Sequence, residues 1–336
     1  MQSIANKTVN NKSIYGTVFS VLKNDSIHTY SSGNISDTTQ YFIASITKLY
    51  TTTVVLKLRS EGKLTLDDRI GKYLSVEVMK DLHVYKGKDY SNEITIRHLL
   101  SQTSGLPDYY EDKPKDGEPL LEELLSGKDQ FIKFERVVDR AKKIPPKFAP
   151  RADKAHYSDT NWQLLQKIVE TITSQTIVDL FQQYIFDPLD LKKTYVFLDV
   201  NDTRPIHLYY KKAPLYIPKA ISGFNADGGI VSTSQESVQF LKAFYSGELF
   251  PKTYLAEMQN WNKIVFPLQY GMGIMRFKLP AIMTGGNALD IIGHAGSSGA
   301  FAFYDKEKDV FIAGTVNQLS ERSASFKLMA QVLNNL

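Results

Sequence analysis

Strand-like segments at both ends of the chain enclose a long helical stretch, and this order limits the possible folds more than any other feature. Near the start, residues 15–30 hold two β-rich stretches around a polar turn at residues 23–25, which is typical of a hairpin. Near the end, residues 300–304 and 310–316 are the arms of a second hairpin. The pattern between them is largely helical. We therefore predict an α/β fold, of the α+β type, whose sheet is assembled from both chain ends.

The helical stretch also predicts how the chain divides. A length of 336 residues suggests about two domains. Helical blocks separated by Pro-, Lys- and Asp-rich linkers occupy residues 76–199, and we assign them to a helical lobe. Residues 1–75 and 200–336 then form a discontinuous sheet domain. The helices expected in the lobe cover residues 95–102, 120–125, 131–143, 161–173 and 178–184; those outside it cover residues 45–62, a segment opened by Thr233, and residues 322–336.

Composition excludes several classes of function. The chain contains no cysteine, which rules out disulfides, thiolate metal sites and a cysteine nucleophile. Its six histidines are scattered and no His-Glu-x-x-His motif occurs, so we predict neither a metal nor a cofactor. With 40 Lys and Arg against 36 Asp and Glu, the net charge of +4 lacks the footprint of a nucleic-acid-binding protein. We expect a small molecule or a short peptide as the partner.

Membrane and targeting signals are weak in this sequence. No apolar run approaches the roughly 20 residues that a membrane helix needs, so we expect no transmembrane segment. The first residues lack the basic and apolar regions of a secretory signal, which predicts a cytoplasmic protein for the sequence as it stands. Had a leader been removed, the periplasm or the extracellular space would be expected instead. The oligomeric state is left open.

The pattern Ser-x-x-Lys is the first candidate for chemistry. A serine nucleophile needs a base, and residues three apart on a helix share a face, so the lysine can reach the serine. The pattern occurs at Ser20/Lys23, Ser45/Lys48 and Ser60/Lys63. Only Ser45 is predicted to open a helix, where its backbone N–H is among the unpaired donors at the positive end of the helix dipole. The alternative is a helix-capping serine followed by a solvated lysine.

A second candidate segment is Tyr157-Ser158-Asp159, which comes directly before a helix. A lysine ammonium close to a tyrosine hydroxyl favours the phenolate, which makes Tyr157 a candidate general base. The alternative is that Asp159 caps the helix and Tyr157 only packs.

A third segment, Gly293-His-Ala-Gly-Ser-Ser-Gly299, precedes a predicted strand. Its three glycines would let a peptide-like substrate lie along the backbone. The N–H of Ser297, paired with that of Ser45, is a candidate oxyanion hole. The alternative is a glycine-rich turn with an incidental His294.

Taken in order, these segments resemble the three signature boxes of the serine β-lactamase and penicillin-binding protein superfamily, in its class C-like branch. The boxes are Ser45-Ile-Thr-Lys48, Tyr157-Ser-Asp159 and His294-Ala-Gly296. Residues 64–74, 94–109 and 227–244 are also similar to family landmarks. The resemblance extends from about residue 14 to residue 330.

The resemblance implies a β-lactamase/transpeptidase-like fold, with a mixed, mainly antiparallel sheet flanked by helices, an all-helical lobe, and the site at their junction. It implies that Ser45 is the acylated nucleophile, Lys48 its proton partner and Tyr157 the general base. The N–H groups of Ser45 and Ser297 would form the oxyanion hole. The residues implied to contact substrate are Asp159, His294, Gly296 and Ser298.

Two departures from the family pattern bear on the activity. Asp159 stands where asparagine is usual, so a donor is replaced by an acceptor-only group when ionised. His294 stands where lysine is usual, which weakens attraction to a substrate carboxylate at neutral pH. We therefore expect a serine hydrolase that cleaves a D-peptide, small amide or ester through an acyl-serine, without efficient β-lactam turnover. The alternatives are a class C-like carboxylesterase and a non-catalytic penicillin-binding sensor or scaffold.

Overall fold

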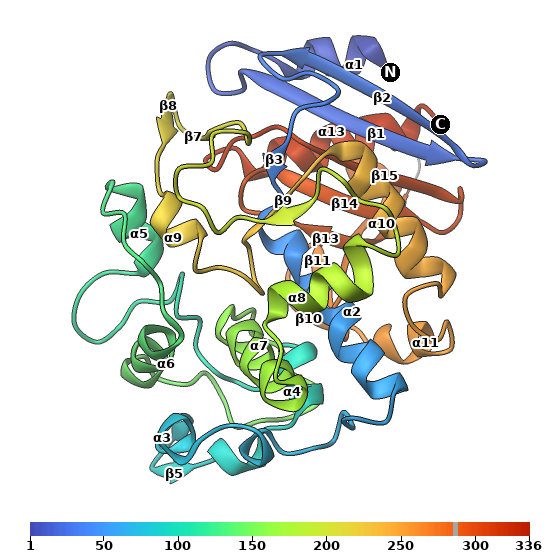
Figure 1. The fold of residues 1–336 in the computed structure, drawn as a ribbon. Coiled ribbons are helices and arrows are strands. Elements are labelled where there is room, and N and C mark those ends of the chain that lie inside the picture. The colour runs from blue at the N-terminus through green and yellow to red at the C-terminus, as the bar shows by residue number, and fades with distance from the viewer. Residues whose placement is uncertain (285–287) are drawn as a thin grey trace.

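The central sheet of the protein is antiparallel throughout and is built from both ends of the chain (Figure 1). The computed structural model describes residues 1–284 and 288–336. The strands lie side by side in the order β10-β11-β12-β13-β14-β15-β1-β2. Their bounds are β1 (Gly16–Lys23), β2 (Ser26–Gly33), β10 (Asn262–Val265), β11 (Leu268–Tyr270), β12 (Met275–Leu279), β13 (Leu289–Ala295), β14 (Ala300–Asp305) and β15 (Val310–Thr315).

The two hairpins predicted from the sequence are neighbours in this sheet, where β15 of one pairs with β1 of the other. Strand β1 pairs with β15 so that Val18 lies opposite Thr315 and Leu22 opposite Phe311. Strand β15 is buried along its whole length, whereas the edge strand β2 is exposed or half-buried. Because both faces of β15 are buried, helices must cover the sheet on both sides. The predicted fold class is confirmed by this arrangement.

Helices from distant parts of the chain provide that cover. Helix α10 (Ser234–Ser246) packs against β1, β14 and β15, while α13 (Arg322–Asn334) packs against β14 and against α1 (Gln2–Thr8). As predicted, Thr233 caps α10, because its side chain accepts a hydrogen bond from the backbone N–H of Glu236. Both chain termini lie at the same end of the molecule (Figure 1).

The regular elements of the stretch predicted as a helical lobe are mainly helices, with two differences. A short hairpin, β4 (Val84–Tyr85) with β5 (Lys88–Asp89), lies within it, and β6 (Tyr195–Val196) pairs with β9 (Ile230–Ser232) next to β3 (Tyr41–Phe42). Strands of two residues leave no periodicity in a sequence. The helices are α3 (Val76–Met79), α4 (Ile96–Leu100), α5 (Leu120–Leu125), α6 (Phe134–Lys143), α7 (Thr160–Thr173) and α8 (Ile177–Phe181). The boundaries 75/76 and 199/200 stay a prediction.

Helix α2 (Thr47–Ser60) joins the two parts of the molecule, since it packs against α7, α8 and β13. It is almost completely buried, although it carries three consecutive threonines. Their hydroxyls donate to the carbonyls of Ala226, Lys48 and Leu49, which satisfies each polar group inside the core. The remaining short elements are η1 (Ala44–Ile46), η2 (Ile70–Lys72), η3 (Ser91–Glu93), η4 (Gln182–Phe186), β7 (Leu208–Tyr210), β8 (Ala213–Leu215), α9 (Pro218–Ile221), α11 (Tyr254–Met258) and α12 (Ala281–Thr284).

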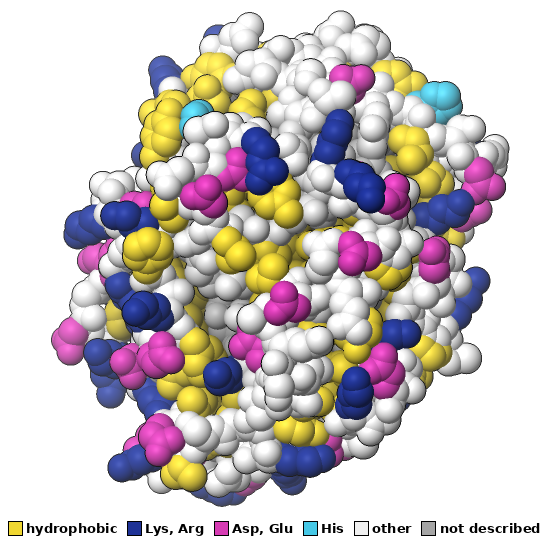
Figure 2. Space-filling model, viewed as in Figure 1, with side chains coloured by type: hydrophobic (Ala, Val, Ile, Leu, Met, Phe, Trp, Pro, Cys, Tyr) yellow, Lys and Arg dark blue, Asp and Glu magenta, His cyan; other side chains and the backbone are white. Residues whose placement is uncertain are grey.

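The surface bears charges of both signs. Figure 2 shows Lys and Arg side chains interspersed with Asp and Glu over one face, with no broad area of a single sign. Within the described residues, no helix is both long and apolar enough to cross a membrane.

Candidate active site

Ser45 lies in a strained turn directly before α2. The sequence predicted that Ser45 opens the helix. In the structure Ser45 lies in η1, a 3₁₀ helix of one turn, and α2 starts two residues later. The preceding residue, Ala44, has φ of 47°, a left-handed conformation that is unfavourable for a residue with a Cβ. Backbone strain of this kind persists only where the surroundings enforce it, and it is common at functional sites.

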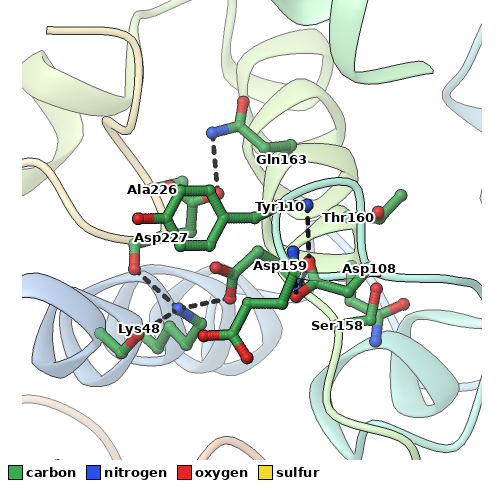
Figure 3. A network of polar contacts seen from close by, with 12 residues as sticks. Lys48, Asp108, Tyr110, Ser158, Asp159, Thr160, Gln163, Ala226 and Asp227 are labelled. Carbon is green, nitrogen blue, oxygen red and sulfur yellow. Dashed lines mark hydrogen bonds and ion pairs between the residues drawn. The ribbon is translucent and has the colours of Figure 1, made fainter. Parts of the chain in front are cut away.

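Lys48 is the centre of the site. Its Nζ lies 2.9 Å from Ser45 Oγ, 2.7 Å from the backbone oxygen of Asp227 and 2.8 Å from Asp159 Oδ1. Figure 3 shows the amine directed between the Asp159 carboxylate and Asp227. The side chain is fully buried, which disfavours the charged form, but Asp159 and Asp227 outweigh this effect and raise the pKa of Lys48. Lys48 is therefore an ammonium that donates to the Ser45 hydroxyl.

The other two Ser-x-x-Lys pairs make no such contact. Ser20 is buried in β1 and bonds to hydroxyls of β2 and α10, while Lys23 reaches the carbonyl oxygen of the last residue. Ser60 donates to a backbone carbonyl one turn earlier in α2, and Lys63 pairs with Glu61.

Tyr157 faces both Ser45 and Lys48. Lys48 Nζ lies 5.4 Å from the centre of the Tyr157 ring. The Ser45 side chain interacts with the Tyr157 hydroxyl and opposes the rise in its pKa. Burial, reinforced by the negative charge of Asp159, raises the pKa of Tyr157 well above its ordinary value. We expected the lysine to favour the phenolate; in the resting site the phenol is the stable form instead.

The loop after α4 holds the Tyr157 segment in place. The Gln102 side-chain oxygen accepts from the Ser158 backbone N–H at 2.9 Å and from Asn161 Nδ2 at 2.6 Å. The Ser158 hydroxyl donates to the backbone oxygen of Pro107 at 2.8 Å. These bonds fix the backbone after Tyr157, and the His156 N–H, which donates to the Gln102 carbonyl at 2.9 Å, fixes it before.

Three carboxyl groups belong to the network around Asp159, the ion-pair partner of Lys48. Besides Asp159, these are Asp108 and Asp227, both buried. Asp108 accepts backbone N–H groups, including that of Asp159 at 3.0 Å (Figure 3), and burial raises its pKa. Asp227 Oδ2 accepts from the Tyr109 hydroxyl and from Gln163, each at 3.0 Å, whereas its Oδ1 is buried without a partner among the described residues. Burial and the nearby Asp159 raise the pKa of Asp227 to about 7.

His294 is buried and neutral. Its Nδ1 lies 2.8 Å from the Ala295 carbonyl and so carries the proton, which leaves Nε2 to accept from the Tyr270 hydroxyl at 3.1 Å. Burial and the Lys48 ammonium lower the pKa of His294 to about 3. The ordinary histidine pKa used in the sequence argument does not hold here. His294 packs near the Tyr157 ring, at 6.2 Å between centres, and does not line the cavity described below.

The glycine-rich segment lies directly against the turn that carries Ser45. A Cβ on Gly296 would lie 2.5 Å from the backbone oxygen of Ile43, so only glycine permits this approach. The Ser298 hydroxyl donates to the backbone oxygen of Phe42 at 2.8 Å and is thus used inside the protein. The backbone N–H groups of Ser45 and Ser297 donate to no partner within residues 1–284 and 288–336.

A cavity opens beside these groups. Ser45, Asp159, Asp227 and Ser297 line it together with apolar side chains. Those apolar and aromatic residues are Phe42, Ala44, Tyr109, Tyr110, Leu208, Ile217, Ile221, Phe224 and Leu319. In the part of the chain that the structure describes, no cluster of three His, Asp or Glu residues is arranged to hold a metal.

Comparison with known proteins identifies the family. The family model named Beta-lactamase matches residues 1–334, which is nearly the whole chain. The chain belongs to the Beta-lactamase family. Within it, a putative D-alanyl-D-alanine carboxypeptidase from Escherichia coli strain K12 is 33% identical over 217 residues, or 62% of this chain and 45% of that protein. The chain spans less than half the length of the curated relatives that it matches first.

Solved structures of similar proteins agree with this assignment. A D-stereospecific amidohydrolase from Streptomyces sp. superposes with a TM-score of 0.81 at 25% identity, covering 97% of this chain and 98% of the other. A D-amino acid amidase from Ochrobactrum anthropi SV3 also gives 0.81, at 22% identity, covering 100% and 99%, and shows that the fold is shared.

Several site residues of this Beta-lactamase family member were not singled out from the sequence. Tyr109 and Asp108 lie in the segment 94–109, and Asp227 begins the segment 227–244, both noted only as similar to family landmarks. Asp227 contacts Lys48 through its backbone, which no side-chain pattern reveals. The buried Tyr270, which bonds to His294, left no signal that we recognised.

Proposed function

We propose that this protein is a serine hydrolase that cleaves a small amide or ester through a covalent intermediate on Ser45. The observation that carries the proposal is the 2.9 Å contact between Lys48 Nζ and Ser45 Oγ on the wall of a cavity. Family membership and the nearby Tyr157 hydroxyl support it. A serine within reach of two proton-carrying groups is the arrangement that nucleophilic catalysis requires.

The protonation of the resting site determines how the reaction starts. Lys48 is an ammonium and Tyr157 a phenol, so the cluster must lose one proton before a base is available. In the active form, the Tyr157 phenolate, stabilised by Lys48, accepts the Ser45 proton. The Ser45 oxygen then bonds to the substrate carbonyl carbon, and the N–H groups of Ser45 and Ser297 stabilise the oxyanion.

Collapse of this intermediate breaks the bond to the leaving group. The proton held by Tyr157 passes to the leaving nitrogen or oxygen, and the acyl group stays on Ser45. A water molecule then gives a proton to Tyr157 while its oxygen attacks the ester carbon. The bond between the acyl carbon and the Ser45 oxygen breaks, Tyr157 returns the proton to that oxygen, and the acid leaves with the Ser45 hydroxyl restored.

The charges in the cavity favour an amide over a β-lactam. Family β-lactam substrates carry a carboxylate, but Asp159 and Asp227 are themselves acids and His294 is neutral. The similarity to the Streptomyces D-stereospecific amidohydrolase supports an amide of D configuration. We thus place the substrate among small D-configured amides, with esters as simpler analogues.

Acylation of Ser45 is the direct test. Mixing the protein with a p-nitrophenyl ester should give a burst of one equivalent followed by steady release, and intact-mass analysis should show the acyl adduct. Ser45→Ala should remove both the burst and the adduct. Ser60→Ala, which changes the serine of another Ser-x-x-Lys pattern, should retain the burst and the adduct. A single equivalent without turnover would indicate a binding protein instead, and adduct formation in Ser45→Ala would refute the nucleophile.

A further inference from the structure

We propose that Asp159 anchors a positively charged α-amino group of the substrate, so that the protein acts on amides of amino acids with a free amino terminus and an apolar side chain. This inference rests on the proposed acyl-enzyme function and specifies what the acyl part must carry. It assigns Asp159 a second contact in addition to its ion pair with Lys48.

The position of Asp159 suits such an anchor. Its Oδ1 and the Ser45 hydroxyl both contact the same atom, Lys48 Nζ, at 2.8 and 2.9 Å. Oδ2 accepts no hydrogen bond from the described residues, and the side chain is 14% exposed on the cavity wall. In an amino-acid amide the α-nitrogen lies only two bonds from the carbonyl carbon that Ser45 attacks. One short substrate can therefore contact both Asp159 and Ser45.

The charge around the cavity favours a cation at this point. Asp227 also lines the cavity, 3% exposed, and its Oδ1 is a buried acceptor without a partner among the described residues. Asp108 lies behind Asp159, but its raised pKa favours the neutral acid, so the negative charge at this point is that of Asp159. Lys48 is the one ammonium among the described residues that pairs with Asp159. Arg322 is paired with Glu111 instead, at 2.9 Å.

Among the described residues that line the cavity, none is a lysine or an arginine, so no cation is available there for a substrate carboxylate. His294 stays neutral because its ring is sealed between Tyr270 and a backbone carbonyl. A substrate with an anionic end would meet only acids, whereas an ammonium would gain a charge-assisted hydrogen bond to Asp159.

The rest of the cavity explains the apolar side chain. Phe42, Leu208, Ile217, Phe224 and Leu319 are among the apolar residues that line the cavity. Sites that combine an apolar lining with a few polar groups bind small organic ligands, and an apolar side chain of the substrate would contact these residues. Asp159 and Ser45 would then hold the two polar ends of the same molecule.

Paired substrates test this assignment. The rate constant kcat/KM is measured at one pH for the p-nitroanilide of D-phenylalanine, its N-acetyl derivative, and the α-hydroxy analogue derived from D-phenyllactic acid. We expect the free amine to be favoured by about 10- to 100-fold over both neutral compounds. In Asp159→Asn this ratio should fall close to one while the neutral compounds are still cleaved. In Asp227→Asn, whose free oxygen is sealed from the cavity, most of the preference should remain.

Each result decides a different point. Equal or better cleavage of the N-acetyl compound by the unaltered protein would overturn the ammonium anchor while leaving the acyl-enzyme intact. An undiminished preference for the free amine in Asp159→Asn would also overturn the ammonium anchor and leave the acyl-enzyme intact. If no compound labels Ser45 in the mass analysis, the proposed function itself fails.

Discussion

Replacing Asp159 by Asn should move the pH dependence of the reaction to lower pH. The ion pair between Asp159 Oδ1 and Lys48 Nζ holds a proton on Lys48, because the carboxylate stabilises the ammonium in a buried site. The reaction requires the cluster of Ser45, Lys48 and Tyr157 to lose one proton. Without the carboxylate the ammonium is less stable, so that proton leaves at a lower pH.

The distance gives the size of this effect. Two unit charges 2.8 Å apart attract each other by about 6 kcal/mol at an effective dielectric constant of about 20. Asp159 is 14% exposed, so solvent replaces part of this attraction when the charge is removed. Opposite charges at such distances commonly shift a pKa by about 1 to 3 units. We expect the acidic limb of kcat/KM to move down by about 1 to 2 pH units, equivalent to about 1.4 to 2.7 kcal/mol.

The assay uses a neutral ester, so that the charge of the substrate is constant over the pH range. The matched control is Asp67→Asn, which removes a carboxylate from an exposed ion pair with Arg97 and should leave the limb in place. A limb that stays where it is in Asp159→Asn, or that moves to higher pH, would show that Asp159 does not hold the proton on Lys48.

Three further changes test the neighbouring parts of the site. Gly296→Ala places a Cβ 2.5 Å from the Ile43 backbone oxygen and should displace the Ser297 N–H, lowering kcat by about 100-fold or more in steady-state assays. Ser298→Ala leaves the Phe42 carbonyl without its buried donor and should cost about 1 to 3 kcal/mol in urea denaturation; an unchanged midpoint would contradict this. His294 has a pKa of about 3 in the folded protein but about 6.5 when unfolded, so protonation of the unfolded chain destabilises the fold as pH falls below 6.5. The free energy of unfolding should drop by about 2 to 3 kcal/mol more between pH 6.5 and 4.5 than in His294→Gln, and parallel curves would refute it.

Local contacts were the most predictable part of the site. The pairing of Ser45 with Lys48 follows from the spacing of three residues at a helix start, and the structure shows the contact. The sheet built from both chain ends was likewise visible in the positions of the two hairpins. Bringing Tyr157 and residues 293–299 to the same place depends on long-range packing, which the sequence indicated only through family resemblance.

The electrostatic state of the site was the least predictable part. The sequence suggested a phenolate at Tyr157 and an imidazole at His294 that titrates near neutral pH. Burial instead raises the pKa of Tyr157, which favours the phenol, and lowers the pKa of His294, which keeps the imidazole neutral. Burial depends on the packing of residues far apart in the chain. The same limit applies to Asp227, whose backbone oxygen contacts Lys48 only because α2 is tied to residue 226 through the Thr51 hydroxyl.

The central position of α2 links chemical reactivity to the completion of folding. The environment of its lysine is supplied by residues 157–163 on one side and 226–230 on the other, which belong to the predicted helical lobe and the sheet domain respectively. A chain in which either side is undocked would retain Ser45 but lose its activation. An ester that acylates Ser45 would therefore label only molecules in which both sides are docked. During refolding, the rate at which this labelling appears would report the rate of docking.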